Sequence, residues 1–554
     1  MRKLTKLLCL MLSLIVTCSV FAGCGGGGDG EDVDTTKTQL YVSNYDGGFG
    51  DEWLYSAKAK FEKLYENTVF EEGKKGVQVW ITPSELNGPA LIDSVLGARE
   101  HVFVAQSVYY YDYLSSGVML DISDVVTESL SEFGEENTIE NKLIKEQKDF
   151  LKVGGKYYAI PHYFGANGII YDVDLFDSCK AFIGADGKFG KKSTDTGLSV
   201  GGDGVANTPD DGLPATYEQF YKLCDRIKGA SYTPIAWSGE HQFNMGYATV
   251  AIAAEANGAK NTNLLYNFNG TSDRVIKSFS TNGKVITVTY ETAPYTINQD
   301  NGYKAFAQAG NYYALEFVNK LVRSEGYLHA NNFTDGVTAQ ATQEEFVLSS
   351  KDSSKTPIAM LVDGNWWENE VSPFMKTMED SGRYEGAGRM DRRFGFMPLP
   401  KPNDTFVGEN HTLLEANNSY MFIRADIDSK YEEVAKLFLK FLNTDENLRE
   451  FSVLTNTPKA LKYDLTNEDK AKMTYFGHNL FDFKNATTTD TVYQCSTNEL
   501  YYNNLSTFAM IEMYKYGNYN FPSSAFNSNA GLTAKSYYDG YIASWQTKYN
   551  NVNK

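Results

Sequence analysis

Gln39-Leu40-Tyr41-Val42-Ser43 opens the stretch that decides the fold, because its alternating pattern is typical of a strand. A glycine-rich turn follows at residues 47–50, and apolar residues then recur at helical spacing over residues 51–65. A second strand is predicted at Val77-Gln78-Val79-Trp80-Ile81, and the next helix over residues 89–96. Strands and helices in alternation predict an α/β fold in which helices cover a parallel sheet.

The same alternation continues along the chain. Gly168-Ile169-Ile170-Tyr171 is predicted to be a buried strand, and Thr216 to cap a helix. Residues 431–442 have the apolar face of an amphipathic helix, and residues 268–295 alternate like a hairpin. Residues 184–214 are too polar for a core, and we expect them to form an inserted loop.

The beginning of the chain predicts export. Basic residues between positions 2 and 6 precede an apolar run that extends towards Phe21 and is too short for a stable membrane span. This pattern is typical of a signal peptide, which we place over residues 1–23.

A cysteine follows the predicted signal peptide. Phe21-Ala22-Gly23-Cys24 resembles the lipobox of bacterial lipoproteins, in which small residues precede a lipidated cysteine. The alternative is a plain signal peptide with an incidental cysteine. Residues 24–37 are rich in glycine and acidic residues, and they predict a flexible tether. Two acyl chains on Cys24 would hold the protein stably at the outer face of the cell membrane.

The composition excludes some partners. The formal net charge is −19, and removal of the basic signal peptide makes it more negative, which disfavours nucleic acid as a partner. Beyond Cys24 the cysteines are Cys179, Cys224 and Cys495, too few for a disulfide scaffold. Stability must therefore come from a large core, and the 38 tyrosines and 33 phenylalanines suit both cores and sugar-binding clefts.

Several segments together resemble the family 1 extracellular solute-binding proteins, the maltose-binding type that serves carbohydrate ABC transporters. Their order and spacing, rather than any single motif, carry the resemblance, and they span most of the mature chain. These segments are residues 45–53, 158–161, 170–176, 359–367, 394–400 and 434–442, followed by Asp445-Glu446 and Thr457-Pro458.

The resemblance implies a two-lobed periplasmic-binding-protein fold, whose discontinuous lobes close over a ligand by hinge motion. Lobe 1 would comprise residues 38–161 and 410–474, and lobe 2 residues 165–405 and 475–554. The implied function is extracellular capture of an oligosaccharide for the permease subunits of an ABC transporter. We expect a monomer that is not an enzyme and requires no cofactor.

Gly364-Asn365-Trp366-Trp367 contains the clearest candidate site residues. Consecutive side chains point in different directions, so both rings cannot enter one core face. In the family a tryptophan here stacks on a sugar ring, and Trp366 fits that spacing better than Trp367. The alternative is that both rings pack in the core or the hinge. Asp363 either accepts hydrogen bonds from sugar hydroxyls or caps the following helix.

Further candidates lie where strands end or where the lobes are expected to join. The turn after the first strand lies at the edge of the sheet where such folds bind ligands. Core packing or hinge hydrogen bonds are the alternative roles for these side chains. The residues are Asp46, Phe49, Trp53, Trp237, Tyr163, Glu415 and Asn417.

Residues 203–211 resemble an oxygen-rich calcium loop. Asp203, Asn207, Asp210 and Asp211 offer the hard oxygen ligands that Ca²⁺ prefers. The full EF-hand pattern is absent, because Val205 stands at the third position and no glutamate closes the loop. The loop is therefore either a structural calcium site or a solvated acidic segment.

Two other function classes are open. A lipid-anchored glycoside hydrolase needs a pair of carboxylates across the scissile bond, and nothing singles out a pair among the 70 acidic residues. A binding protein for a polyamine, peptide or metal chelate would suit the acidic charge. The aromatic richness favours a sugar.

Overall fold

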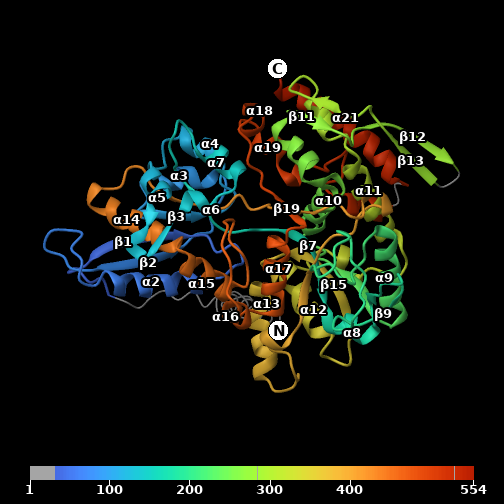
Figure 1. The fold of residues 1–554 in the computed structure, drawn as a ribbon, viewed down its shortest axis with the longest axis horizontal. Coiled ribbons are helices and arrows are strands. Elements are labelled where there is room, and N and C mark those ends of the chain that lie inside the picture. The colour runs from blue at the N-terminus through green and yellow to red at the C-terminus, as the bar shows by residue number, and fades with distance from the viewer. Residues whose placement is uncertain (1–31, 283–284, 529–530) are drawn as a thin grey trace, which may run out of the picture.

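The computed structural model describes residues 32–282, 285–528 and 531–554, which form two lobes side by side (Figure 1). The predicted signal peptide and Cys24 lie outside the described residues. Within the described part of the chain, no helix combines the length and apolar character needed to cross a membrane. The α/β, two-lobed fold predicted from the sequence is confirmed.

Lobe 1 is built on a five-stranded sheet whose spatial order is β2-β1-β3-β18-β6. The pairs β1–β2 and β1–β3 are parallel, whereas β18 is antiparallel to both β3 and β6. The sheet is therefore mixed, not all parallel as we expected. Its strands are β1 (Thr38–Asn44), β2 (Val77–Pro83), β3 (Val102–Ala105), β6 (Ile160–Pro161) and β18 (Tyr420–Ile423).

Helices cover the lobe 1 sheet with their apolar faces. On α2, Leu54, Ala57 and Phe61 are buried at helical spacing, and they join Leu40 and Val42 of β1 in one core. The helices of this lobe are α2 (Glu52–Leu64), α3 (Ala90–Val95), α4 (Tyr110–Ser115), α5 (Ser123–Thr127), α6 (Ile139–Lys142), α7 (Lys145–Leu151), α14 (Ser429–Leu442), α15 (Asp445–Thr455) and α16 (Asn467–Lys472).

Lobe 2 is built on a four-stranded sheet with the order β10-β15-β7-β16. β15 is buried along its whole length, parallel to β10 and antiparallel to β7. The strands are β7 (Asn167–Asp172), β10 (Thr233–Ala236), β15 (Ile358–Gly364) and β16 (Phe394–Met397). The main helices are α8 (Val173–Cys179), α9 (Tyr217–Gly229), α10 (Phe243–Asn267), α11 (Ala309–Arg323), α12 (Ala339–Ser349), α13 (Trp367–Asp380), α17 (Tyr475–Asn485), α18 (Glu499–Tyr502), α20 (Pro522–Asn527) and α21 (Ala534–Val552).

The chain passes between the lobes more than once. Residues 162–166 lead from β6 to β7, and residues 415–419 lead from β17 (His411–Leu414) to β18. β17 pairs in parallel with β19 (Thr489–Val492) and packs against α10, on the lobe 2 side. The return to the lobe 1 sheet thus comes at β18, after the boundary at residue 410 that we expected.

The predicted hairpin and insertion also take definite forms. β12 (Ile276–Asn282) and β13 (Val285–Tyr290) pair antiparallel, as the alternating pattern indicated. Within the inserted residues 184–214, only β9 (Phe189–Lys191) is a regular strand, and it pairs with β8 (Phe182–Ile183).

Candidate ligand-binding site

A buried carboxylate, Asp363, lies near the end of β15, close to where lobe 2 meets lobe 1. It accepts hydrogen bonds from Gln343 Nε2 of α12 (3.0 Å) and from Asn244 Nδ2 of α10 (3.3 Å). Gln343 Nε2 also donates to Glu370 Oε2 of α13, at 2.6 Å. We call Asp363, Gln343, Glu370 and Asn244 the carboxylate–amide cluster.

Both acids of the cluster have raised pKa values. Burial, and after it the neighbouring Glu370 carboxylate, raises the pKa of Asp363 to about 7. Burial also raises the pKa of Glu370, with a smaller contribution from Asp46 of lobe 1. Converging acids of this kind favour a ligand that donates hydrogen bonds or carries positive charge.

The loop after β1 brings lobe 1 against this cluster. Gly47 and Gly48 have φ values of +61° and +82°, a region that glycine enters without strain. A Cβ atom on Gly48 would lie 2.8 Å from Glu370 Oε1, so the backbone of lobe 1 touches a side chain of lobe 2. Asp46 lies beside this contact, and its Oδ1 accepts the Gly50 N–H.

Aromatic rings continue the contact between the lobes. Trp366 is half-buried just before α13, and its ring meets the edge of Phe49 at a centroid distance of 6.3 Å. Phe49 is buried and stacks on Tyr163 at 4.5 Å. The structure thus brings together Asp363, Trp366, Asp46, Phe49 and Tyr163 from the predicted site. Phe49 and Tyr163 are buried beneath it.

Three predicted tryptophans lie in the cores instead. Trp367 is fully buried among Phe346, Phe394 and Phe476, because it points away from its neighbour Trp366. Trp237 is fully buried against Phe333, and its Nε1–H donates to Gln242. Trp53 is buried on α2, with its ring against His162 and Phe451. A position at a strand end did not fix the direction of these rings.

Glu415 and Asn417 lie inside the crossing between β17 and β18. Glu415 Oε1 accepts the Asn417 N–H at 2.7 Å, and burial raises the pKa of Glu415 to about 7. The Asn417 side chain packs on Gly165 of the other crossing, so closely that a Cβ there would lie 2.1 Å from its Cγ. Glu415 and Asn417 therefore make contacts within the hinge, which is the alternative role expected for both residues.

Sequence reasoning missed several residues near the cluster. Phe243 and Tyr247 are half-buried on the first turns of α10, with ring centroids 5.9 Å apart. Tyr109 of lobe 1 lies near Tyr247, whose pKa is raised by burial and then by that neighbour. The available signal was their place at the start of the apolar helix that follows β10. Gln343 and Glu370 gave no such signal.

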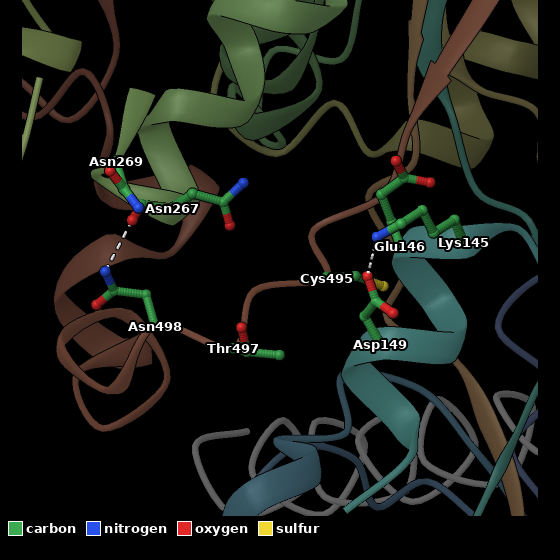
Figure 2. Close-up of a pocket in the computed structure, with 8 residues that line it drawn as sticks. All are labelled: Lys145, Glu146, Asp149, Asn267, Asn269, Cys495, Thr497 and Asn498. Carbon is green, nitrogen blue, oxygen red and sulfur yellow. Dashed lines mark hydrogen bonds and ion pairs between the residues drawn. The ribbon is translucent and has the colours of Figure 1, made fainter. Parts of the chain in front are cut away.

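A pocket of about 410 Å³ also spans the two lobes (Figure 2). Residues of α7 form its lobe 1 side, where Lys145 and Asp149 make an ion pair. On the lobe 2 side, Asn498 Nδ2 donates to the Asn267 carbonyl at 2.7 Å. The lining is polar apart from the sulfur of Cys495: Lys145, Glu146, Asp149, Asn267, Asn269, Cys495, Thr497 and Asn498.

Comparisons with solved structures agree with this architecture. The raffinose complex of the solute-binding protein RafE has a TM-score of 0.52 and 14% identity, covering 94% of this chain and 100% of RafE. A chitin oligosaccharide binding protein has a TM-score of 0.52 and 14% identity, covering 93% of this chain and 99% of its own. At these identities the likeness concerns the fold alone.

A third structure comes from Bifidobacterium animalis subsp. lactis: BlMnBP1, an ABC transporter binding protein in complex with mannobiose. Its TM-score is 0.52 at 14% identity, covering 93% of this chain and 95% of BlMnBP1.

No curated protein matches the sequence. Residues 50–448 match the family described as bacterial extracellular solute-binding protein, which implies a place outside the cytoplasm. With that match over most of the chain and a two-lobed fold, the protein belongs to the family 1 bacterial extracellular solute-binding proteins.

Proposed function

We propose that the protein captures an oligosaccharide outside the cell and delivers it, chemically unchanged, to the permease of an ABC transporter. This proposal rests on the junction of the lobes. There the carboxylate–amide cluster and the half-buried Trp366 of lobe 2 face the loop after β1 of lobe 1, which contains Asp46. Carboxylates and amides bond sugar hydroxyls, and aromatic faces stack on the apolar faces of sugar rings. Because both lobes contribute groups, a ligand there would favour the closed state.

The comparisons support this proposal. The similar structures include proteins that hold raffinose and mannobiose, and one described as a chitin oligosaccharide binding protein. The lipobox-like run ending at Cys24 fits a receptor that stays at the membrane beside its permease.

A second candidate ligand is an amine-bearing solute such as a polyamine. Asp363, Glu370 and Asp46 bring three carboxyl groups to one junction, and each has a raised pKa, for which burial is the first cause. A cationic ligand would lower the electrostatic cost of ionising them.

Calorimetry with neutral oligosaccharides and with polyamines separates the two ligands. We expect binding of an oligosaccharide, and Trp366→Ala should weaken it by roughly 1–3 kcal/mol, the worth of one large buried ring. Trp80→Ala is the matched control, because Trp80 is a half-buried tryptophan on β2 whose Nε1–H bonds Gln39.

If the protein binds a polyamine and no sugar, the ligand is the polyamine and the oligosaccharide proposal is wrong. If Trp366→Ala and the wild type bind the oligosaccharide with equal affinity, Trp366 does not contact the ligand. Chromatography after long incubation should recover the sugar intact. Cleavage at a rate proportional to protein concentration would overturn the binding function in favour of a hydrolase.

A further inference from the structure

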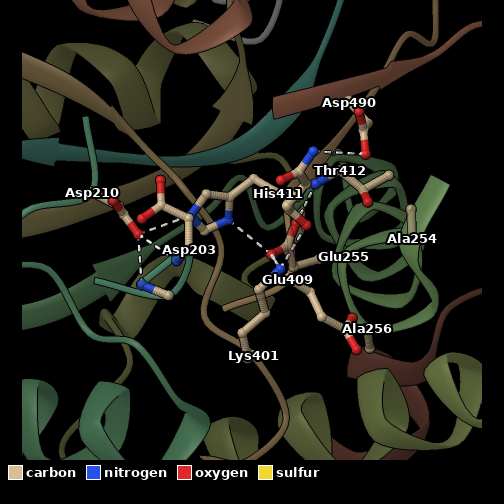
Figure 3. Close-up of polar contacts among 12 residues, drawn as sticks. Asp203, Asp210, Ala254, Glu255, Ala256, Lys401, Glu409, His411, Thr412 and Asp490 are labelled. Atoms are coloured by element: carbon tan, nitrogen blue, oxygen red, sulfur yellow. Dashed lines mark hydrogen bonds and ion pairs between the residues drawn. The ribbon is translucent and has the colours of Figure 1, made fainter. Parts of the chain in front are cut away.

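An inserted loop in lobe 2 brings two buried carboxylates against a buried histidine. Residues 201–211 place Asp203 and Asp210 beside His411, the first residue of β17 (Figure 3). The ligand atoms of these three residues lie within 4.8 Å of one another. Each residue is at most 3% exposed.

The spacing of the ligand atoms suits a metal ion. His411 Nε2 lies 2.9 Å from Asp210 Oδ2. Two ligand atoms that each lie about 2.1 Å from a metal, at right angles, are about 3 Å apart. In the structure this contact is a hydrogen bond, and its length equals one edge of an octahedral site, so that a metal ion could take the place of the shared proton.

Asp203 provides an unused ligand. Its Oδ1 accepts the Val205 N–H at 2.8 Å, whereas its Oδ2 is buried and has no hydrogen-bond partner among the described residues. A buried carboxylate oxygen without a partner is unfavourable, and a bound cation would satisfy it.

A second carboxylate fixes the histidine ring from behind. His411 Nδ1 lies 2.8 Å from Glu255 Oε1 of α10. Glu255 is held in turn by Lys401 Nζ (2.6 Å) and by the Thr412 N–H (2.7 Å). Metal-bound histidines usually donate their other ring N–H to a carboxylate, which leaves the second nitrogen free to bind the metal.

The charge of the buried group also favours a divalent ion. Three carboxylates, of Asp203, Asp210 and Glu255, are buried here together with the ammonium group of Lys401. Protonation of His411 would leave one uncompensated negative charge, whereas a divalent ion with neutral His411 would leave none. Buried charges are stable when they are paired or bind metals.

The loop backbone is shaped around Asp210. Gly201 has a φ of +61°, and a Cβ there would lie 2.1 Å from Asp210 Oδ2. The N–H groups of Gly202 and Asp203 both donate to that oxygen, at 2.5 and 3.0 Å. The position of Asp210 therefore depends on glycine at 201.

We propose that Asp203, Asp210 and His411 bind one divalent transition-metal ion such as Zn²⁺ or Mn²⁺, with Glu255 positioning His411. An imidazole ligand favours these ions over Ca²⁺, which prefers oxygen ligands alone. Of the residues expected for calcium, Asn207 is exposed, and Asp211 Oδ2 accepts the Asn207 N–H at 2.8 Å. The ion ties the loop to α10 and to β17, the strand that leads into the hinge crossing.

Asp203→Asn gives the sharpest test. It keeps the oxygen that bonds Val205 and removes the charge of the unpartnered oxygen, without touching the bonds of His411. The mature protein is stripped with a chelator and titrated separately with Zn²⁺, Mn²⁺, Ca²⁺ and Mg²⁺. Calorimetry gives stoichiometry and affinity, and the thermal unfolding midpoint reports stabilisation. Asp195→Asn, an exposed carboxylate of the same insertion that is not a candidate ligand, is the control.

We expect one Zn²⁺ or Mn²⁺ per chain, a higher melting temperature on binding, and at least about a tenfold loss of affinity in Asp203→Asn. Asp195→Asn should bind like the wild type. No binding of any of the four ions, preference for Ca²⁺, or equal affinity in Asp203→Asn and wild type would each overturn the proposal. If Asp203→Asn does not fold, the wild type is loaded with Co²⁺ and freed of unbound ion by gel filtration. Retention of about one Co²⁺ per chain, with a d–d band shifted from that of aqueous Co²⁺ by the imidazole ligand, supports the site, and loss of all Co²⁺ overturns it.

Discussion

The carboxylate of Glu370 lies against the backbone of Gly48, so that the two lobes touch where a side chain on residue 48 would stand. This contact exists only when the lobes are close, because Gly48 follows β1 of lobe 1 and Glu370 lies on α13 of lobe 2. It links lobe closure to the carboxylate–amide cluster through the Glu370–Gln343–Asp363 hydrogen bonds.

Gly48→Ala should therefore weaken ligand binding. Its Cβ would displace Glu370, and we expect a loss of about 1 kcal/mol, or about fivefold in Kd by calorimetry. Gly50→Ala is the matched control, because Gly50 also has a positive φ (+79°) but a Cβ there would have nothing within 4 Å. Both variants should lose about 1 kcal/mol of stability from backbone strain. Equal affinities in the two variants would show that the contact with Glu370 does not influence closure.

Asp363→Asn should flatten the dependence of stability on pH. The pKa of Asp363 is raised from 3.8 to about 7, so the native state holds a proton that the unfolded chain releases. This contribution to stability is complete below pH 3.8 and is lost as the pH rises to about 7, at up to about 1.4 kcal/mol per pH unit.

Denaturant unfolding at pH 5 and pH 8 measures the effect. The wild type should lose more stability between these values than Asp363→Asn. Asp380→Asn, an exposed carboxylate at the end of α13, should behave like the wild type. A slope in Asp363→Asn equal to that of the wild type would contradict the raised pKa.

A ring stack joins the lobes at a second place. Tyr111 of α4 stacks on Tyr502 of α18 at a centroid distance of 4.1 Å. Removing either ring should favour the open state and weaken ligand binding, with a coupling of about 0.5–1.5 kcal/mol in the double-mutant cycle. The cycle compares the Kd of Tyr111→Ala, Tyr502→Ala and the double variant. Additive effects would mean that the stack contributes equally in the open and closed states.

Cys24→Ala should release the protein from membranes. Lipidation of Cys24 is expected from the lipobox-like run before it, and two acyl chains suffice for stable anchoring. Fractionation of cells that carry the wild type or the variant measures this. A wild type found free in the medium with an unmodified N-terminus would contradict the anchor.

The alternation of strands and helices in the sequence was enough for the fold class and for the hairpin of β12 and β13. It was not enough for the mixed sheets, because the antiparallel partners of β3 and β15 come from distant parts of the chain. Strand periodicity marks which residues are buried, and it does not encode which strand lies alongside.

The candidate site was predictable where residues share one local segment. Asp363 and Trp366 were predicted because both belong to the segment of residues 359–367 that resembles the family. Gln343 and Glu370 were missed, since they lie on α12 and α13 and meet only through tertiary packing. Similarly, His411 lies beside Asp203 and Asp210 in the fold. Asp210 stands 201 residues before His411 in the sequence, and no motif spans such a separation.

The interleaving of the two lobes determines when each can fold during synthesis. The core of lobe 1 needs β18 and α14, and the core of lobe 2 is completed by α21, where Trp545 stacks on Phe306 at 3.8 Å. Neither core can close while the second half of the chain is still on the ribosome. Lobe 2 therefore exposes apolar surface until α21 emerges, and this incomplete core is open to aggregation during synthesis.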